Sequence, residues 1–190
     1  MFPRPSQTAI ATCVKRESLF LVAFSVGNWD KNLLRLLFNK VEDYVQQPSY
    51  KHKLILYSDG NDDYTSVLLE YYHKDCLCYG QKIKTKDGKK VFPPIKKIVY
   101  GDMNPDDIET NTVESINSVL REKISRLCRK TKKISKNKYS LDSSLWLFKF
   151  AWNFIHKRHE HFLTPAMIEG ISHKRWTWGM FLHAKLTDVS

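Results

Sequence analysis

Hydrophobic and polar positions predict a β-hairpin near the start of the chain. Residues 8–14 and 18–26 are short runs rich in β-branched and aromatic side chains, and the polar residues 15–17 separate them. Within the second run, residues 19–24 are almost continuously apolar. Strands of that kind are covered on both faces, so we expect this one to lie centrally in its sheet.

Helical spacing follows the hairpin. Asp30 is placed to cap a helix in which apolar residues recur every three or four positions. These apolar residues are Leu33, Leu34, Leu37, Phe38, Val41 and Val45. Residues 53–57 then predict a strand that stops at a turn, 58–60, and residues 64–72 and 76–83 predict a short helix and a further strand.

A lysine-rich segment separates these elements from the second half. Residues 82–97 hold seven lysines and one acid, Asp87, which predicts an exposed hairpin around Asp87-Gly88. Residues 95–100 predict one more strand. From Val113 onward, apolar residues return at helical spacing, at Ile116, Leu120, Ile124 and Leu127. A last helix over residues 141–157 is heavily aromatic, and we expect it to pack into the core.

The order of these elements predicts an α/β fold with a mixed sheet flanked by helices. Ligand sites in such sheets gather at the carboxyl ends of strands. Asp59 directly follows a predicted strand, and Glu114 falls in the first turn of a predicted helix. The 55 residues from one to the other allow the chain to return over the sheet. We therefore expect the two carboxylates to converge.

Charge favours a polyanionic partner. The 190 residues include 31 Lys and Arg against 20 Asp and Glu, a net charge of +11. Residues 121–138 concentrate nine basic residues with one acid, Glu122, which favours contact with a DNA backbone over a merely solvated face. No apolar run is long enough to span a bilayer, and four scattered cysteines do not suggest a disulfide framework. These features predict a cytoplasmic chain.

Asp59 and Glu114 are the residue types that hold Mg²⁺ for phosphodiester chemistry. A pair of metal ions roughly 3.5–4 Å apart stabilises the attacking and leaving oxygens, and carboxylates hold such ions while leaving room for substrate. Each residue also has a plain structural interpretation. Asp59 can form a turn, and Glu114 can cap a helix three residues after Asn111. The residues by themselves leave both interpretations open.

Several strings occur together and in order. They are Tyr57-Ser58-Asp59-Gly60, then residues 111–117 with Leu120-Arg121, residues 126–131, Ser135-Lys136, and residues 164–176. In this order they resemble the Asp-Asp-Glu (DDE) insertion-sequence transposases, in particular the group named after the first bacterial insertion sequence. The resemblance spans residues 8–182.

The resemblance implies an RNase H-like catalytic domain over residues 1–160 and a helical C-terminal extension over residues 161–190. Such a domain cleaves the ends of a mobile element and joins them to target DNA, using Mg²⁺ or Mn²⁺ in a two-metal site. Asp59 then takes the place of the second catalytic Asp and Glu114 that of the catalytic Glu. The implied partner is DNA, both element ends and target, in the cytoplasm with the chromosome, and assembly as a homo-oligomer stays open. The expected DNA-binding residues are Asn117, Arg121, Lys123, Arg126, Arg129, Lys130, Lys132, Lys133 and Lys136.

The chain also departs from the family pattern. In the family, the first catalytic Asp lies on a strand that precedes the one matched by residues 8–14, and residues 1–7 contain no acid. Glu17 and Asp30 follow strands that match later family strands, so neither replaces it. We therefore expect an N-terminally truncated copy that lacks the first strand and is inactive by itself. A non-catalytic basic nucleic-acid-binding module and an inactive remnant are the alternatives.

Overall fold

The computed structural model describes residues 9–87, 90–124, 138–158 and 162–184. It contains two compact units, one of residues 1–13 with 22–118 and one of residues 14–21 with 119–190. The division into a domain of residues 1–160 and an extension of residues 161–190 stays a prediction.

The predicted hairpin and first helix are confirmed as β1 (Ala9–Val14), β2 (Leu21–Gly27) and α1 (Lys31–Glu42). The Asp30 side chain caps α1 by accepting a hydrogen bond of 3.0 Å from the Leu33 amide, because the first amides of a helix have no partner inside it. Capping and apolar spacing therefore fix where this helix begins and which face it buries.

The expected central position of β2 is wrong within the described residues. Most of β2 is buried, as predicted, but its only partner among the described strands is β1. At the start of β2, the Leu21 amide donates to Asn153 Oδ1 at 2.9 Å, and Asn153 Nδ2 donates to the Leu21 carbonyl at 3.0 Å. A side-chain amide thus takes the backbone bonds that a neighbouring strand would otherwise make there.

A three-stranded mixed sheet follows, in the order β3 (Leu54–Asp59), β4 (Leu77–Ile83) and β7 (Ile95–Tyr100). β3 and β4 run parallel and β4 and β7 antiparallel, so the predicted mixed α/β fold is confirmed. The helix α2 (Asp62–Tyr71) connects β3 to β4 through a 3₁₀ turn, η1 (Lys74–Cys76).

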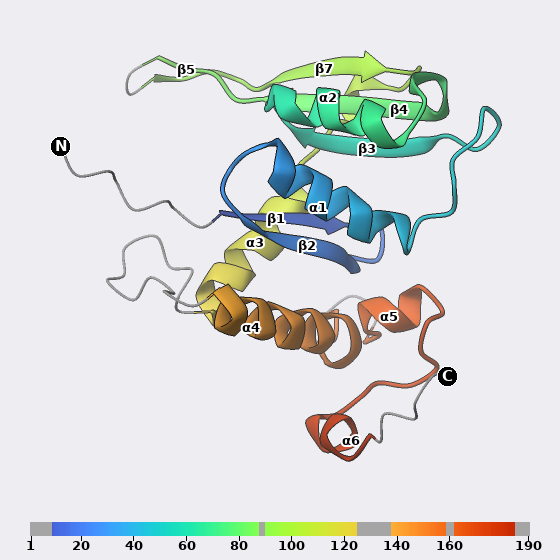
Figure 1. The fold of residues 1–190 in the computed structure, drawn as a ribbon, viewed down its shortest axis with the longest axis vertical. Helices are drawn as coiled ribbons and strands as arrows, with labels where there is room; N and C mark the ends of the chain where they lie inside the picture. Colours follow the sequence, from blue (N-terminus) through green and yellow to red (C-terminus); the bar gives the residue numbers. More distant parts are fainter. Residues whose placement is uncertain (1–8, 88–89, 125–137, 159–161, 185–190) are drawn as a thin grey trace. The chain divides into compact units, whose positions relative to one another are not determined.

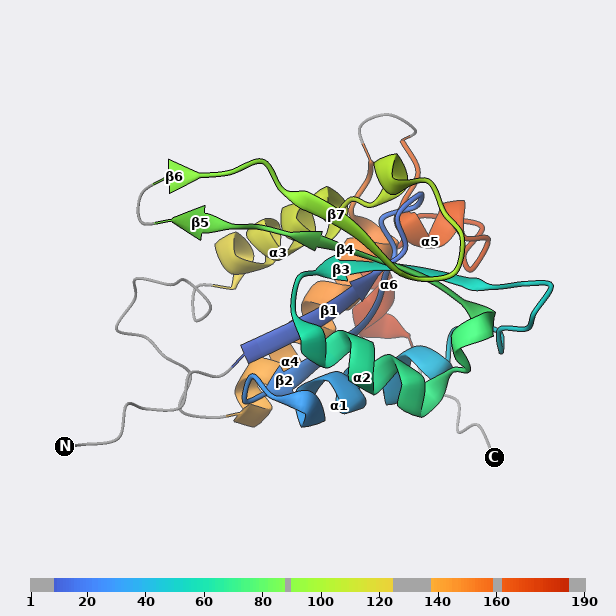
Figure 2. The ribbon, with the colours of Figure 1, turned by 90° about the horizontal axis from the view of Figure 1, so that it is seen from above.

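The predicted lysine-rich hairpin is also present. Its short strands β5 (Lys86–Asp87) and β6 (Lys90–Val91) pair antiparallel between β4 and β7 and extend beyond the sheet (Figure 2). After β7 come a 3₁₀ turn, η2 (Pro105–Asp107), and α3 (Asn111–Lys123). The buried side chains of Ile116, Leu120 and Ile124 confirm the predicted apolar stripe as far as residue 124.

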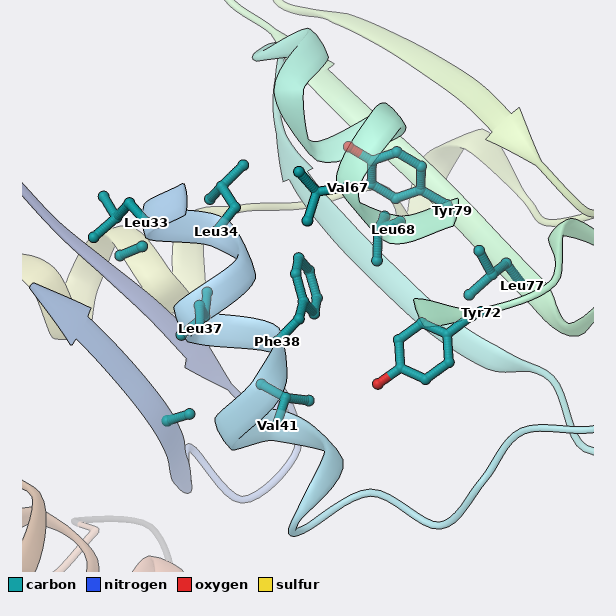
Figure 3. Close-up of a cluster of buried hydrophobic side chains, with 12 residues drawn as sticks. Leu33, Leu34, Leu37, Phe38, Val41, Val67, Leu68, Tyr72, Leu77 and Tyr79 are labelled. Carbon is teal, nitrogen blue, oxygen red and sulfur yellow. The ribbon is translucent and has the colours of Figure 1, made fainter. Parts of the chain in front are cut away.

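One hydrophobic core joins the strands and helices of the first unit. α1 and α2 lie on the same side of the strands (Figures 1 and 2). Figure 3 shows Phe38 of α1 directed toward α2, where Val67 and Leu68 are almost fully buried. The core consists of Ala11, Ala23, Leu33, Leu34, Leu37, Phe38, Val41, Val67, Leu68, Tyr72, Leu77 and Tyr79.

This core underlies two sheets that are not hydrogen-bonded to each other. Ala11 of β1 and Tyr79 of β4 belong to the same cluster, yet β1 pairs only with β2, and β3 pairs only with β4, among the described strands. β1 and β3, like β2 and β7, are therefore edge strands, each with one side that has no strand partner in the part of the chain that the structure describes.

The second unit is helical. The predicted helix over residues 141–157 is α4 (Lys138–Phe150) continued by a π-helical turn, η4 (Ala151–Ile155), and α5 (Pro165–Ile168) and α6 (Trp178–His183) follow. Phe150 contacts Trp176, with ring centroids 5.7 Å apart, and Trp178, at 6.4 Å. Trp176 and Trp178 therefore pack on the aromatic helix.

Burial of the aromatic helix is only partial. Leu141 and Leu145, four residues apart, are fully buried, whereas Trp146 and Leu147 are about half exposed, at 45% and 48%. The reason is the helical period, which places residues four apart on one face and turns the next two residues away from it. None of the helices in the described ranges is both long enough and apolar enough to cross a membrane.

Candidate functional site

Asp59 is the last residue of β3, and its side chain is exposed. Its Oδ1 accepts a hydrogen bond of 3.3 Å from the amide of Asn61, the residue that caps α2. The turn-forming role is therefore present, because an Asp side chain readily bonds backbone two residues onward. That role uses one carboxylate oxygen at a strand end that faces solvent.

The neighbour of Asp59 in the sheet is Lys82 of β4, in parallel register. Register partners in adjacent strands lie about 4.8 Å apart and point to the same face. Lys82 is only 8% exposed, and its ammonium donates to Glu109 Oε2 at 2.6 Å and to Asn111 Oδ1 at 3.0 Å. Because Asn111 is the first residue of α3, Lys82 links β4, the strand beside Asp59, to the start of that helix.

Gly80, which has no side chain, lets the segment before α3 approach β4 closely. A Cβ at Gly80 would lie 2.7 Å from side-chain atoms of Ile108, which is fully buried. Gly101 has a φ of +74°, a conformation that other residues adopt at a cost, and it turns the chain immediately after β7. These two glycines bring residues 102–110 over the sheet and so set where α3 begins.

Glu114 lies in the first turn of α3, as predicted. Its Oε1 accepts hydrogen bonds from Thr110 Oγ1 at 2.7 Å and from Lys84 Nζ at 2.6 Å. The bonds from Lys84 and Thr110 hold the pKa of Glu114 below its ordinary value, so the carboxylate is charged at neutral pH. The capping partner is thus Thr110 rather than the predicted Asn111, whose side chain is bound by Lys82.

The buried Lys82 shares its ion-pair partner, Glu109, with a second lysine. Glu109 lies between Lys82 and Lys96, with its Oε1 3.3 Å from Lys96 Nζ. Hydrogen bonds from these two lysines lower the pKa of Glu109, Lys82 contributing most. Sequence reasoning missed Lys82 and Glu109. The available signal was that Lys82 lies inside the predicted strand 76–83 and two positions before Lys84, so both lysines face the same side.

Asp59 and Glu114 are suited to a hard divalent cation. Both supply carboxylate oxygens on side chains open to solvent, Glu114 being 45% exposed, and Mg²⁺ and Mn²⁺ prefer such ligands. Within the described ranges, no group of three or more His, Cys, Asp or Glu residues is arranged to hold a metal. The convergence of the Asp59 and Glu114 carboxylates to roughly 4–8 Å around a shared metal stays a prediction.

The predicted DNA-binding residues fall into three groups. Asn117 is partly buried, and its Oδ1 accepts from Thr12 Oγ1 at 2.9 Å, so its side chain joins α3 to β1. Arg121 and Lys123 are exposed on α3, where Lys123 lies 3.2 Å from Glu122. The others lie outside the described residues: Arg126, Arg129, Lys130, Lys132, Lys133 and Lys136.

No protein-family model matches the chain, and searches of curated proteins and of solved structures found no match.

Proposed function

We propose that this chain forms part of a DDE-type DNA transposase catalytic domain, in which Asp59 and Glu114 are two metal-binding carboxylates. The observation that carries the proposal is the position of Lys82. It neighbours Asp59 in the sheet and binds Asn111, one turn before Glu114. Lys82 is thus the register neighbour of one carboxylate residue, and its ammonium binds the helix start that carries the other, 55 residues further along the chain.

The surrounding residues prepare the two carboxylates for binding a cation. Thr110 is only 3% exposed, and its hydroxyl fixes the orientation of Glu114. Glu109 neutralises the buried charge of Lys82, which would otherwise repel a cation near Asp59. When bound, Mg²⁺ or Mn²⁺ supplies charge stabilisation to the attacking and leaving oxygens of a phosphodiester. The chain contributes the ligands and their placement.

The β1-β2 sheet and the β3-β4-β7 sheet are not hydrogen-bonded to each other in the described residues, which suggests that the site is incomplete. β1 and β3 each have an edge without a partner in the described part of the chain, although they share one core. We propose that a complete RNase H-like sheet has one further strand, which carries the third carboxylate and which the resemblance places before residues 8–14. A site with two of three carboxylates holds its metals poorly, so the chain by itself should bind DNA without cutting or joining it.

DNA is the proposed substrate, because the charge of +11 suits a phosphate backbone. We propose that element ends and target DNA are held through Arg121, Lys123 and the basic residues that follow, with little sequence preference. The cytoplasm, with the chromosome, is the corresponding location. Neutralising about six phosphates would lower affinity by ~10³-fold between 50 and 200 mM salt.

The test measures Mn²⁺ binding by electron paramagnetic resonance and duplex binding by fluorescence anisotropy. Asp59→Asn and Glu114→Gln should each weaken Mn²⁺ binding, because each removes a charged ligand. Asp43→Asn, an exposed acid at the end of α1, is the matched control and should not.

Two outcomes would contradict the proposal and support an alternative. Salt-dependent DNA binding with Mn²⁺ affinity unaltered by both site variants would indicate a non-catalytic basic nucleic-acid-binding module. Binding of neither DNA nor Mn²⁺ would indicate an inactive remnant. Cleavage of an element-end duplex by the unaltered chain, lost in Asp59→Asn, would refute the missing third carboxylate.

A further inference from the structure

We propose that Lys84 couples metal binding to DNA binding, because its ammonium and a divalent cation compete for the same carboxylate of Glu114. When the cation takes Glu114, Lys84 is released to bind a DNA phosphate at the site. This inference rests on the proposed function of Glu114 as a metal ligand.

The competition follows from the hydrogen bonds at one atom. Glu114 Oε1 accepts from both Lys84 Nζ, at 2.6 Å, and Thr110 Oγ1, at 2.7 Å. A carboxylate oxygen has two lone pairs, and these two donors use both. A cation binding through Oε1 must displace one donor, and a cation binding through the other oxygen meets the positive charge of Lys84 at short range. In either geometry, Lys84 opposes the cation.

Lys84 is the donor that can move. Thr110 is buried, and its short side chain leaves its hydroxyl little freedom. The Lys84 side chain is 51% exposed, and its four-carbon stem can redirect the ammonium within solvent. Lys82, two residues earlier and inside β4, is held by Glu109 and Asn111 and is 8% exposed. Of these two lysines, Lys84 is therefore the one available to a ligand.

A released Lys84 lies where phosphate must bind. Any phosphodiester attacked at a metal on Glu114 places its charged oxygens within a few ångströms of that carboxylate, and a lysine ammonium binds phosphate well as a point charge. The exchange replaces the pairing of Lys84 with Glu114 by two pairings, one between the cation and Glu114 and one between Lys84 and the phosphate. Metal binding then favours DNA binding, and by thermodynamic reciprocity DNA favours the metal by the same factor.

The size of the coupling is limited by the exposure of the pair. Exposed ion pairs contribute little, and breaking this one should change an equilibrium by about two- to five-fold. The effects of removing Lys84 have opposite signs for the two ligands. This sign pattern distinguishes competition at Glu114 from a general loss of positive charge, which would weaken DNA binding alone.

The experiment compares the unaltered chain with Lys84→Gln and with Lys51→Gln, which removes one exposed charge near the other end of β3. Mn²⁺ affinity is measured by electron paramagnetic resonance, and affinity for a 20-base-pair duplex by anisotropy with and without Mn²⁺. Lys84→Gln should bind Mn²⁺ about two- to five-fold more tightly, bind the duplex more weakly, and lose the gain in DNA affinity that Mn²⁺ produces. Lys51→Gln should keep that gain.

The contrary results separate this inference from the proposed function. If Glu114→Gln weakens Mn²⁺ binding but Lys84→Gln leaves it unchanged or weaker, the competition is refuted and the metal site stands. A Mn²⁺-dependent gain in DNA affinity that survives in Lys84→Gln also refutes the coupling. If Glu114→Gln leaves Mn²⁺ binding unchanged, the metal site itself is refuted, and the coupling falls with it.

Discussion

Replacing Lys82 by Met should destabilise the first unit far more than the same replacement two residues away at Lys84. Met keeps the length and apolar volume of the lysine stem but removes the ammonium that Glu109 and Asn111 both bind. The loss leaves a partly buried carboxylate facing a strand that no longer carries a charge. It also removes the link between β4 and the start of α3.

The magnitude follows from the burial of the two partners. Removing one member of a fully buried ion pair costs about 3–5 kcal/mol, because the other charge is left unpaired. Here the Glu109 side chain is 28% exposed and keeps Lys96 as a second partner, so solvent and Lys96 recover part of that energy. We expect a loss of about 1–3 kcal/mol in the free energy of unfolding. Lys84→Met breaks an exposed pair and should cost less than about 1 kcal/mol.

The pH dependence gives an independent check. Hydrogen bonds from Lys82 and Lys96 lower the pKa of Glu109 in the folded chain. A depressed carboxylate pKa contributes stability above the unfolded pKa, about 4.3, and that stability is lost as pH falls through the folded pKa. The difference between Lys82→Met and the unaltered chain should therefore be complete at neutral pH and shrink at more acidic pH.

The assay is urea unfolding followed by far-ultraviolet circular dichroism, at neutral pH and below the ordinary pKa of Glu. The reasoning is refuted if Lys82→Met costs no more than Lys84→Met at neutral pH. It is also refuted if the cost of Lys82→Met stays constant as the pH falls, because the lost interaction would then not involve an ionised Glu109.

Three further substitutions test the packing. Tyr72→Phe should leave the free energy of unfolding unchanged or raise it by up to about 1 kcal/mol, because the Tyr72 hydroxyl is buried without a hydrogen-bond partner in the described chain; a marked loss on urea unfolding would contradict this. Gly80→Ala should cost about 1–3 kcal/mol in the same assay, because its Cβ would lie 2.7 Å from Ile108, and a neutral result would show that Ile108 has room to move. Asn153→Ala should cost about 2–4 kcal/mol by tryptophan fluorescence, because it leaves both backbone groups of Leu21 without their partner, and retained stability would mean that water replaces the amide.

Local features of the fold could be predicted from the sequence because their causes are local. Asp30 caps α1 through an amide three residues away, and apolar spacing placed the buried face of the helix correctly. Asp59 at a strand end and Glu114 in the first turn of a helix follow from patterns within a few residues of each. The lysine-rich hairpin follows from Asp87-Gly88 and its charge.

Contacts between distant segments were decided by the tertiary structure. Glu114 is held by Thr110 and by Lys84, 30 residues before it, and no local pattern specifies the second partner. β2 was expected at the centre of a sheet because its apolar run predicts burial, but a run of this kind says nothing about what buries it. Here the side chain of Asn153, 132 residues from Leu21, binds the backbone of Leu21 at the start of β2.

The sequence by itself determined the order of elements, the apolar faces and the two candidate carboxylates, since each depends on the period and identity of neighbouring residues. The tertiary structure decided the role of Lys82. Lysine side chains are normally exposed, and nothing distinguishes Lys82 from the other six lysines of residues 82–97 as a buried one. It is buried here because the segment packed on Gly80 brings Glu109 and Asn111 to its ammonium.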